Sequence, residues 1–322
     1  MRRFLRAMAP AAALAALALA VPATSHAFVA GLGDQKPETF SDPLFRALKV
    51  KRTRYIVAWD AVNDPVQRAR VDAWFAAARR AKLEILVAFN HSAGMQCPAQ
   101  PCHAPRVSAY TRAVKKFHRR WGRYVKAYQP WNESNSATQP TSSMGKGRRQ
   151  AKKGARLVAR YYLALKKIAG RKRTVTGADI QDIGAFTQYA KDFLAAIPRK
   201  QRPKVMGLHN YNDTNYRRTR YTQQFIKALP RGTKIWLTET GGLYRFTPAS
   251  GVGGLPPSES RQKRAMSHLF KLARKFRRQI DRVYIYQWKA NATDRFDAGV
   301  VSPEGQKRPA YDVLVTYRKY FR

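Results

Sequence analysis

Two glutamates stand in short polar motifs that could do chemistry. Glu133 lies in the string WNESN (131–135), and Glu239 lies in the string LTETGG (237–242). Each motif closes a β-branched and aromatic run that predicts a buried strand. Paired carboxyl groups about 5 to 5.5 Å apart are what retaining cleavage of a glycosidic bond requires, one to attack the anomeric carbon and one to protonate the leaving oxygen. The simpler alternative for either glutamate is an ion pair with one of the many arginines.

Polar and aromatic residues also follow the other predicted strands. They are Trp59 with Asp60, Asn90 with His91, Asn132, Asp179, His209 with Asn210 and Tyr211, and Gln287 with Trp288. The carboxyl ends of parallel strands meet at one face of a barrel, so these side chains are expected to converge on one cavity.

Aromatic residues at the strand ends can stack on the apolar faces of sugar rings. We expect this of Trp59, Trp131, Tyr211 and Trp288. The amide of Asn90 is expected to line the same cavity. His91 either orients a substrate or is an ordinary loop histidine.

The elements that position these residues alternate regularly along the chain. Apolar, β-branched runs predict strands over 28–35, 53–59, 83–89, 124–132, 174–178, 204–211, 233–239 and 282–288. Helical patterns predict helices over 42–49, 64–81, 106–120, 150–169, 185–197, 219–229, 259–279 and 309–320. Eight strand–helix rounds over residues 28–322 predict one domain, a closed (β/α)8 TIM barrel of parallel strands. No glycine-rich phosphate motif follows the first strand, which argues against a dinucleotide-binding fold.

Two segments rich in Ser, Gly and Pro, 140–149 and 248–258, follow strand ends. They are predicted to be long loops on the active face of the barrel rather than linkers between domains.

Residues 1–27 have the pattern of a secretory signal peptide. Arg2, Arg3 and Arg6 precede an apolar run over 9–21, and Ser25-His26-Ala27 predicts cleavage after Ala27. The alternative is an uncleaved membrane anchor, but the run is shorter than the roughly 20 residues that a span needs. The mature chain is therefore expected to be secreted, with no transmembrane segment.

The chain is strongly basic, with 62 Lys and Arg against 19 Asp and Glu and a formal net charge of +43 over 322 residues. Such a charge favours association with anionic polymers, including those of a cell envelope, or serves only as a solvated surface. The basic residues are spread over nearly every predicted helix, and no motif for specific nucleic-acid recognition accompanies them.

The only two cysteines, Cys97 and Cys102, lie close together in the sequence. In an exported protein this spacing predicts a disulfide that closes a loop. A zinc site formed with His91 and His103 is the alternative, but the spacing fits no common zinc pattern.

Taken together, the eightfold alternation, Trp131-Asn132-Glu133 after strand four and Thr238-Glu239 after strand seven resemble clan A of the glycoside hydrolases. The resemblance covers the mature chain in architecture. It implies retaining (β/α)8 enzymes that act on carbohydrate without metal or organic cofactor, with Glu133 as acid/base and Glu239 as nucleophile. It also implies that Asn132 donates to the sugar 2-hydroxyl, that His209 and Tyr211 lie near the nucleophile, and that Trp288 forms the aromatic floor of that subsite.

The motifs also depart from individual families in the clan. Family five, family thirty-nine and their β-1,3-glucanase relatives carry Trp-Asn-Glu-Pro-Asn, whereas Ser134 replaces the proline here. Family five commonly has an arginine at the end of strand two, where this sequence has Trp59-Asp60. Two other classes of function remain open, a non-catalytic barrel that binds envelope polysaccharide and a polyanion-binding protein whose charge is its main feature.

Overall fold

The computed structural model describes residues 28–142, 147–248 and 253–322. The predicted signal peptide, 1–27, lies outside the described residues, as do residues 143–146 and 249–252 of the two predicted loops.

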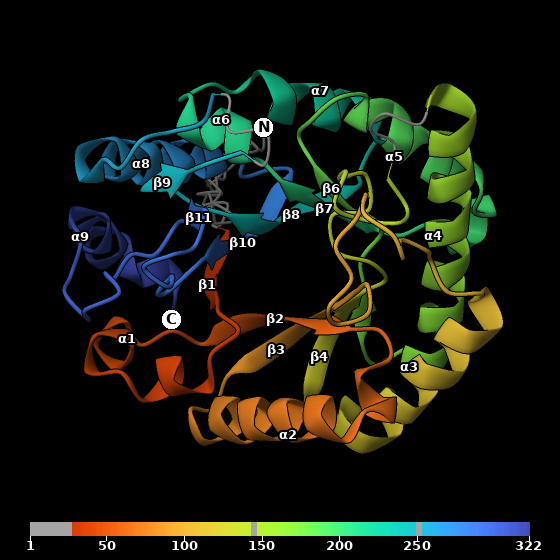
Figure 1. Ribbon diagram of the computed structural model, residues 1–322. Helices are drawn as coiled ribbons and strands as arrows, with labels where there is room; N and C mark the ends of the chain where they lie inside the picture. The colour runs from red at the N-terminus through yellow and green to blue at the C-terminus, as the bar shows by residue number, and fades with distance from the viewer. Residues whose placement is uncertain (1–27, 143–146, 249–252) are drawn as a thin grey trace, which may run out of the picture.

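The chain forms a (β/α)8 TIM barrel, with parallel strands inside and helices in an outer layer around them (Figure 1). In the described residues the barrel wall consists of β1 (Val29–Gly33), β2 (Arg52–Ala58), β3 (Glu84–Asn90), β4 (Val125–Gln129), β5 (Thr174–Val175), β6 (Asp179–Gln181), β7 (Val205–His209), β8 (Lys234–Thr240) and β10 (Ile280–Tyr286). Neighbouring strands pair in the order β5-β4-β3-β2-β1-β10-β8-β7-β6. The predicted fold class is confirmed.

The barrel closes through β5, which lies within the predicted fifth strand (174–178), and β6, which begins one residue after the predicted end of that strand. β5 pairs with β4, and β6 pairs with β7. Between them, the Thr176 N–H donates to the Tyr128 carbonyl on one side, and the Gly177 N–H donates to the Val205 carbonyl on the other. One continuous segment thus joins both ends of the strand order.

The helices of the outer layer are α1 (Pro43–Leu48), α2 (Pro65–Arg80), α3 (Val107–Trp121), α4 (Gly147–Ala169), α5 (Phe186–Ala195), α6 (Tyr211–Asn215), α7 (Arg220–Ala228), α8 (Glu259–Lys275) and α9 (Pro309–Thr316). The first two begin at Asp-Pro, as predicted. The carboxylates of Asp42 and Asp64 accept from the Leu44 and Gln67 N–H groups, each at 2.8 Å, and so cap these helices. The short α6 and the antiparallel pair β9 (Arg245–Phe246) and β11 (Phe296–Asp297) were not predicted.

Two apolar regions hold the barrel together. The larger lies between strands and helices, where Trp74 of α2 stacks on Tyr55 of β2 with ring centroids 4.1 Å apart. The smaller lies inside the barrel and consists of Leu86, Ala127, Trp236 and Tyr284. Above this inner layer, toward the carboxyl ends of the strands, the barrel interior becomes polar, and the candidate site lies there.

The predicted disulfide is confirmed, because Cys97 and Cys102 are bonded to each other. The alternative zinc site is therefore wrong, since neither thiolate is available as a ligand. Of the helices in residues 28–142, 147–248 and 253–322, none combines the length and the apolar character needed to cross a bilayer.

Candidate active site

Arg54 is the centre of the polar layer inside the barrel. Side chains alternate along β2, so Tyr55 packs outward on Trp74 while Arg54 points inward. The Arg54 side chain is 2% exposed. A buried guanidinium needs partners for its donors and a compensating negative charge.

The partners of Arg54 come from β4 and the residues just after it, from β6 and from β8. Nε donates to Gln129 at 2.7 Å, one terminal nitrogen donates to Glu239 at 2.6 Å, and the other donates to both Asn132 and Asp179 at 2.7 Å. The rigid fork of the guanidinium therefore sets the relative positions of these side chains.

A β-bulge in β8 turns Glu239 into the same space. Leu208 of β7 lies opposite Leu237, but the next residue, His209, lies opposite Glu239, so the register skips Thr238. Adjacent strand residues normally face opposite sides, whereas here the Thr238 hydroxyl donates to Asp179 and Glu239 accepts from Arg54. The bulge brings two consecutive side chains into one site.

Glu133 is held in an unusual backbone conformation just beyond β4. Its φ is +43°, in the left-handed region that costs a non-glycine residue of order 1–3 kcal/mol. The following residues anchor the turn to β6. The Ser134 N–H and hydroxyl both donate to the Asp179 carbonyl, and Asn135 exchanges two hydrogen bonds with the Gln181 backbone. The WNESN motif thus fixes where Glu133 points.

His209 bridges two carboxylates at the end of β7. Its Nδ1 lies 3.0 Å from Glu133 Oε1, and its Nε2 lies 3.0 Å from Asp179 Oδ2. An ionised carboxylate can only accept, so both ring nitrogens donate and the ring is an imidazolium. Burial opposes this charge, but the carboxylates of Asp179 and Glu239 outweigh burial and raise the pKa of His209 to about 10.

The two predicted catalytic glutamates are brought together. A carboxylate oxygen of Glu133, one of Glu239 and a ring nitrogen of His209 lie within 4.8 Å of one another. The Tyr211 hydroxyl donates to Glu239 Oε1 at 3.0 Å. Tyr211 is therefore beside the predicted nucleophile, whereas the direct hydrogen bond of His209 is to the predicted acid/base.

The charges around the glutamates differ. Burial raises the pKa of Glu239, with the charges of Glu133 and Asp179 acting in the same direction and those of His209 and Arg54 opposing them. Asp179 is buried too, but His209 and Arg54 lower its pKa to about 2. The two cations thus balance two carboxylates, Asp179 and Glu239. Glu133 is the third carboxyl group of the cluster, and His209 contacts it as well.

Asn132 is in the site, and the remaining predicted polar residues form a neighbouring group. Arg54 has only donors, so the Asn132 amide oxygen must face it, and the amide nitrogen is the group that can donate to a substrate. Trp59 donates from its backbone to the Asn90 carbonyl and from its ring to Ser92, whose carbonyl lies 2.8 Å from His91 Nδ1. These hydrogen bonds stay within the group and do not reach the two glutamates.

Two tryptophans lie outside the cavity expected for them. Trp288 is 1% exposed, packs on Phe45 and Tyr311 in the helix layer, and donates from its ring to Asp42. Trp131 is fully buried and stacks on Tyr161. Neither can form the floor of a sugar subsite. β10 ends at Tyr286, two residues earlier than the predicted strand, and Tyr286 is the β10 aromatic residue whose pKa is raised by burial and by the Glu239 charge.

Sequence reasoning missed three supporting residues, Arg54, Gln129 and Gln181, and left Asp179 without a role. The sequence has no arginine at the very end of strand two, yet Arg54, four residues before the last residue of β2, reaches Glu239. The signal was present, since Arg54 is two positions from Arg52 and alternates with Thr53 and Tyr55. The alternative considered for each glutamate was an ion pair with an arginine. Glu239 does form such a pair, with Arg54.

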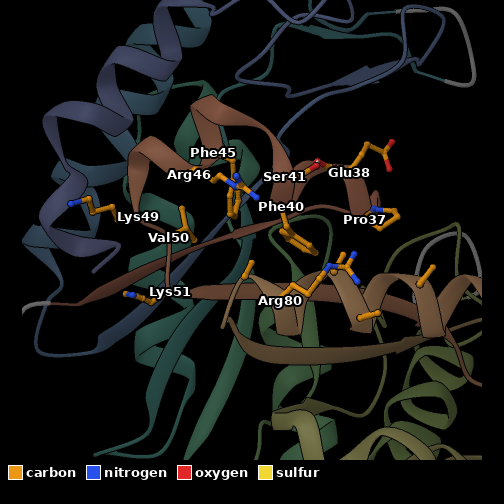
Figure 2. A pocket seen from close by; sticks show the side chains of 14 residues that line it. Pro37, Glu38, Phe40, Ser41, Phe45, Arg46, Lys49, Val50, Lys51 and Arg80 are labelled. Atoms are coloured by element: carbon orange, nitrogen blue, oxygen red, sulfur yellow. The ribbon is translucent and has the colours of Figure 1, made fainter.

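Of two cavities on the barrel, one lies away from this site and the other borders it. One of about 860 Å³ lies on the outside of the barrel, between α2 and the segment formed by η1 (Pro37–Ser41) and α1, and Figure 2 shows Phe40 and Arg80 among its lining residues. It contains none of the site residues. A smaller cavity of about 290 Å³ includes Gln181 and Tyr211, which bond to Glu133 and Glu239.

Comparisons with known proteins agree on the architecture. No protein-family model matches the chain, and no curated protein matches it. An endo-1,4-β-xylanase from Caldicellulosiruptor owensensis aligns over 90% of this chain and 97% of its own, with a TM-score of 0.62 and 11% identity. The catalytic domain of a mannanase from Streptomyces sp. SirexAA-E aligns over 89% and 84%, with a TM-score of 0.57 and 16% identity.

The chain has the barrel fold of these glycoside hydrolases. A mutant of Bacteroides uniformis β-glucuronidase 2 shares it as well, with a TM-score of 0.58 and 14% identity over 92% of this chain and 34% of that one. The resemblance to clan A is thus confirmed in its fold, with no family within the clan singled out. At these identities the likeness establishes the architecture, and the function has to be argued from the site.

Proposed function

We propose that this protein is a retaining glycoside hydrolase that cleaves a β-linked oligo- or polysaccharide by double displacement. The observation that carries the proposal is the pairing of Glu133 and Glu239, whose carboxylate oxygens approach within 4.8 Å although they come from the carboxyl ends of β4 and β8, which are not adjacent in the barrel wall. A spacing of about 5 to 5.5 Å between carboxyl groups suits direct attack by one of them, whereas inverting enzymes leave room for a water.

Glu239 serves as the nucleophile. Arg54 and Tyr211 donate to its two oxygens, which favours the ionised form and fixes its direction. A Glu239 oxygen forms a bond to the anomeric carbon while the bond from that carbon to the leaving oxygen breaks. A glycosyl ester on Glu239 results.

Glu133 serves as acid and then as base. His209 and Gln181 both donate to its Oε1, so Oε2 is the oxygen that can carry the transferred proton. Glu133 gives that proton to the leaving oxygen in the first step. In the second it takes a proton from water as the water oxygen attacks the anomeric carbon and releases Glu239.

The remaining groups suit a sugar substrate. The Asn132 amide nitrogen can donate to a hydroxyl beside the reacting carbon, since its oxygen is held by Arg54. The buried Oδ1 of Asn90 is without a hydrogen-bond partner among the described residues and can accept from another hydroxyl. The fold relatives include a xylanase and a mannanase, which favours a β-linked pyranose polymer, and neither metal nor organic cofactor has a step in this scheme.

We also propose that the protein acts outside the cell, after cleavage behind Ala27, and that its positive charge favours anionic envelope polymers near its substrate; this charge is +43 for the whole chain and three lower once Arg2, Arg3 and Arg6 are removed. Phe28 is 2% exposed and stacks on Tyr320 with ring centroids 4.3 Å apart. A mature chain starting at Phe28 would therefore begin inside the core. Amino-terminal sequencing of the exported protein tests the cleavage site, and salt-dependent retention on anionic polymer tests the association.

The decisive experiment is covalent trapping. The protein is treated with 2-fluoro glycosides and cyclophellitol-type epoxides of xylo, gluco and manno configuration, and the labelled peptide is located by mass spectrometry. Label on Glu239 is expected, with none in Glu239→Gln and wild-type labelling in Glu259→Gln, a control at the exposed start of α8. Label on another carboxyl group, or no label from any of these reagents, contradicts the assignment of Glu239 as the nucleophile. The absence of any label would instead favour a non-catalytic barrel that only binds polysaccharide.

A further inference from the structure

The cavity of about 290 Å³ opens directly beside the catalytic pair. Gln181 lines it and donates to Glu133, and Tyr211 lines it and donates to Glu239. Its other walls come from the segments that follow β6, β7, β8 and β10. Trp59 follows β2, Asn90 is the last residue of β3, and Asn132 follows β4, so these three residues lie on another part of the rim.

The lining is mainly apolar and partly exposed. It contains Ile183, Tyr211, Leu243, Phe246, Leu255 and Phe296. Phe246 of β9 and Phe296 of β11 are directly opposite in an antiparallel pair, with ring centroids 6.1 Å apart, and Phe296 meets Tyr211 edge-on at 5.3 Å. Phe246 is 36% exposed. Open aromatic surface of this kind, at the edge of a polar site, marks a binding site.

The polar residues of the lining mostly bond within the protein. Asn215 donates to the Tyr211 and Gly241 carbonyls and accepts from the Leu243 N–H. Asn212 donates to Asp182, whose carboxylate also accepts from the Asp213 N–H. The cavity therefore offers aromatic contact area rather than the row of hydrogen-bonding groups that a sugar ring requires.

We propose that this aromatic pocket, formed by the six apolar residues above, binds an uncharged aromatic ring carried on the leaving-group side of the substrate. The inference rests on the proposed function, which gives Glu133 the task of protonating the leaving oxygen. Gln181 joins that glutamate to the pocket wall, so a group bonded to the leaving oxygen lies next to the pocket. A bare sugar would lose its hydroxyl partners there, and a carboxylate would have to be desolvated.

The test compares two hydrolysis-resistant ligands, the ethyl and the 2-phenylethyl 1-thio-β-glycosides, in xylo, gluco and manno configuration. Both are titrated into the protein by calorimetry, and saturation transfer to the phenyl protons reports ring contact. For the sugar that binds, the phenylethyl ligand is expected to have a Kd at least about tenfold lower. Phe246→Ala, at the exposed edge, should reduce this ratio to about threefold or less without affecting the ethyl ligand. Val66→Ala, exposed on α2, is the control.

A ratio near one in the wild-type protein overturns the proposal, as does a ratio unchanged in both Phe246→Ala and Phe296→Leu. The outcomes also separate it from the proposed function. If Glu239 is labelled but the phenylethyl ligand binds no more tightly than the ethyl ligand, the proposed hydrolase function stands and the proposed ring-binding role of the pocket is wrong. If saturation transfer to the phenyl protons depends on Phe246 but Glu239 is never trapped, the ring-binding role of the pocket stands and the proposed hydrolase function is wrong.

Discussion

Arg54 and Glu239 form a buried ion pair at 2.6 Å, although they lie 185 positions apart in the chain. The pair links β2 to β8 across the inside of the barrel, and both side chains are at least nine-tenths buried. Because Arg54 also donates to Gln129, Asn132 and Asp179, the position of the proposed nucleophile depends on one guanidinium.

Replacement of Arg54 by lysine keeps the positive charge but removes the planar fork. An ammonium cannot reach four partners in this arrangement, so buried acceptors lose their donors. We expect kcat/KM to fall by about a hundredfold or more and the free energy of unfolding to fall by about 2–3 kcal/mol, measured by steady-state kinetics and urea unfolding. Arg52→Lys is the control, because Arg52 is on the same strand but its side chain is 19% exposed, and equal losses in the two variants would contradict the role given to Arg54.

The raised pKa of Glu239 predicts the acid limb of activity. As the proposed nucleophile, Glu239 must be ionised, so kcat/KM should decline at a pH above the ordinary glutamate value of about 4.3. Glu133 is one of the charges that raises this pKa, so Glu133→Gln should move the limb to lower pH. An aryl glycoside with a good leaving group keeps the first step measurable without the acid. The interpretation fails if the limb moves upward, or moves equally in Glu259→Gln.

His209 should make the protein less stable at high pH. Its folded pKa of about 10 is above the ordinary histidine value of about 6.5, so the proton stabilises the folded state. This contribution is complete below pH 6.5 and is lost as the pH rises toward 10, by an amount on the order of a few kcal/mol. Urea unfolding at pH 6 and pH 10 should show a smaller decline in His209→Asn than in the wild type. His268→Asn, on α8 and away from the barrel interior, should decline like the wild type, and a similar decline in all three proteins would exclude His209 as the cause.

The fold and the proximity of Glu133 and Glu239 could be predicted because both depend on strong local patterns. Alternating strands and helices specify the barrel, and a glutamate directly after an apolar strand must lie near the carboxyl face. The supporting residues have no such pattern. With 62 lysines and arginines in the chain, Arg54 is distinguished only by its alternation with outward residues of β2.

The errors at Trp131 and Trp288 have a physical reason. A residue just beyond a strand can face either the cavity or the helix layer, and the sequence does not fix that direction where the strand ends earlier than predicted. β4 ends at Gln129 and β10 at Tyr286, so both tryptophans lie in loops that turn them toward the helices. The bulge at Thr238 was equally unpredictable, because it is a property of strand pairing rather than of either residue.

The position of Asp179 requires that residue 207 of β7 be a glycine, and this requirement can be tested. A methyl group there would overlap Asp179 Oδ1 and lie 3.0 Å from Thr238 Oγ1 and 3.1 Å from Gln129 Nε2. Asp179 cannot retreat without disturbing its bonds to Arg54 and His209, so Gly207→Ala should cost about 1–3 kcal/mol in the free energy of unfolding and reduce kcat/KM more than tenfold. Gly33→Ala in β1 is the matched control, because its added methyl would meet only ordinary contacts of 3.5 Å or more. If Gly207→Ala retains wild-type stability and activity, Asp179 does not need its present position, and the hydrogen bonds that join it to Arg54 and His209 do not organise the site.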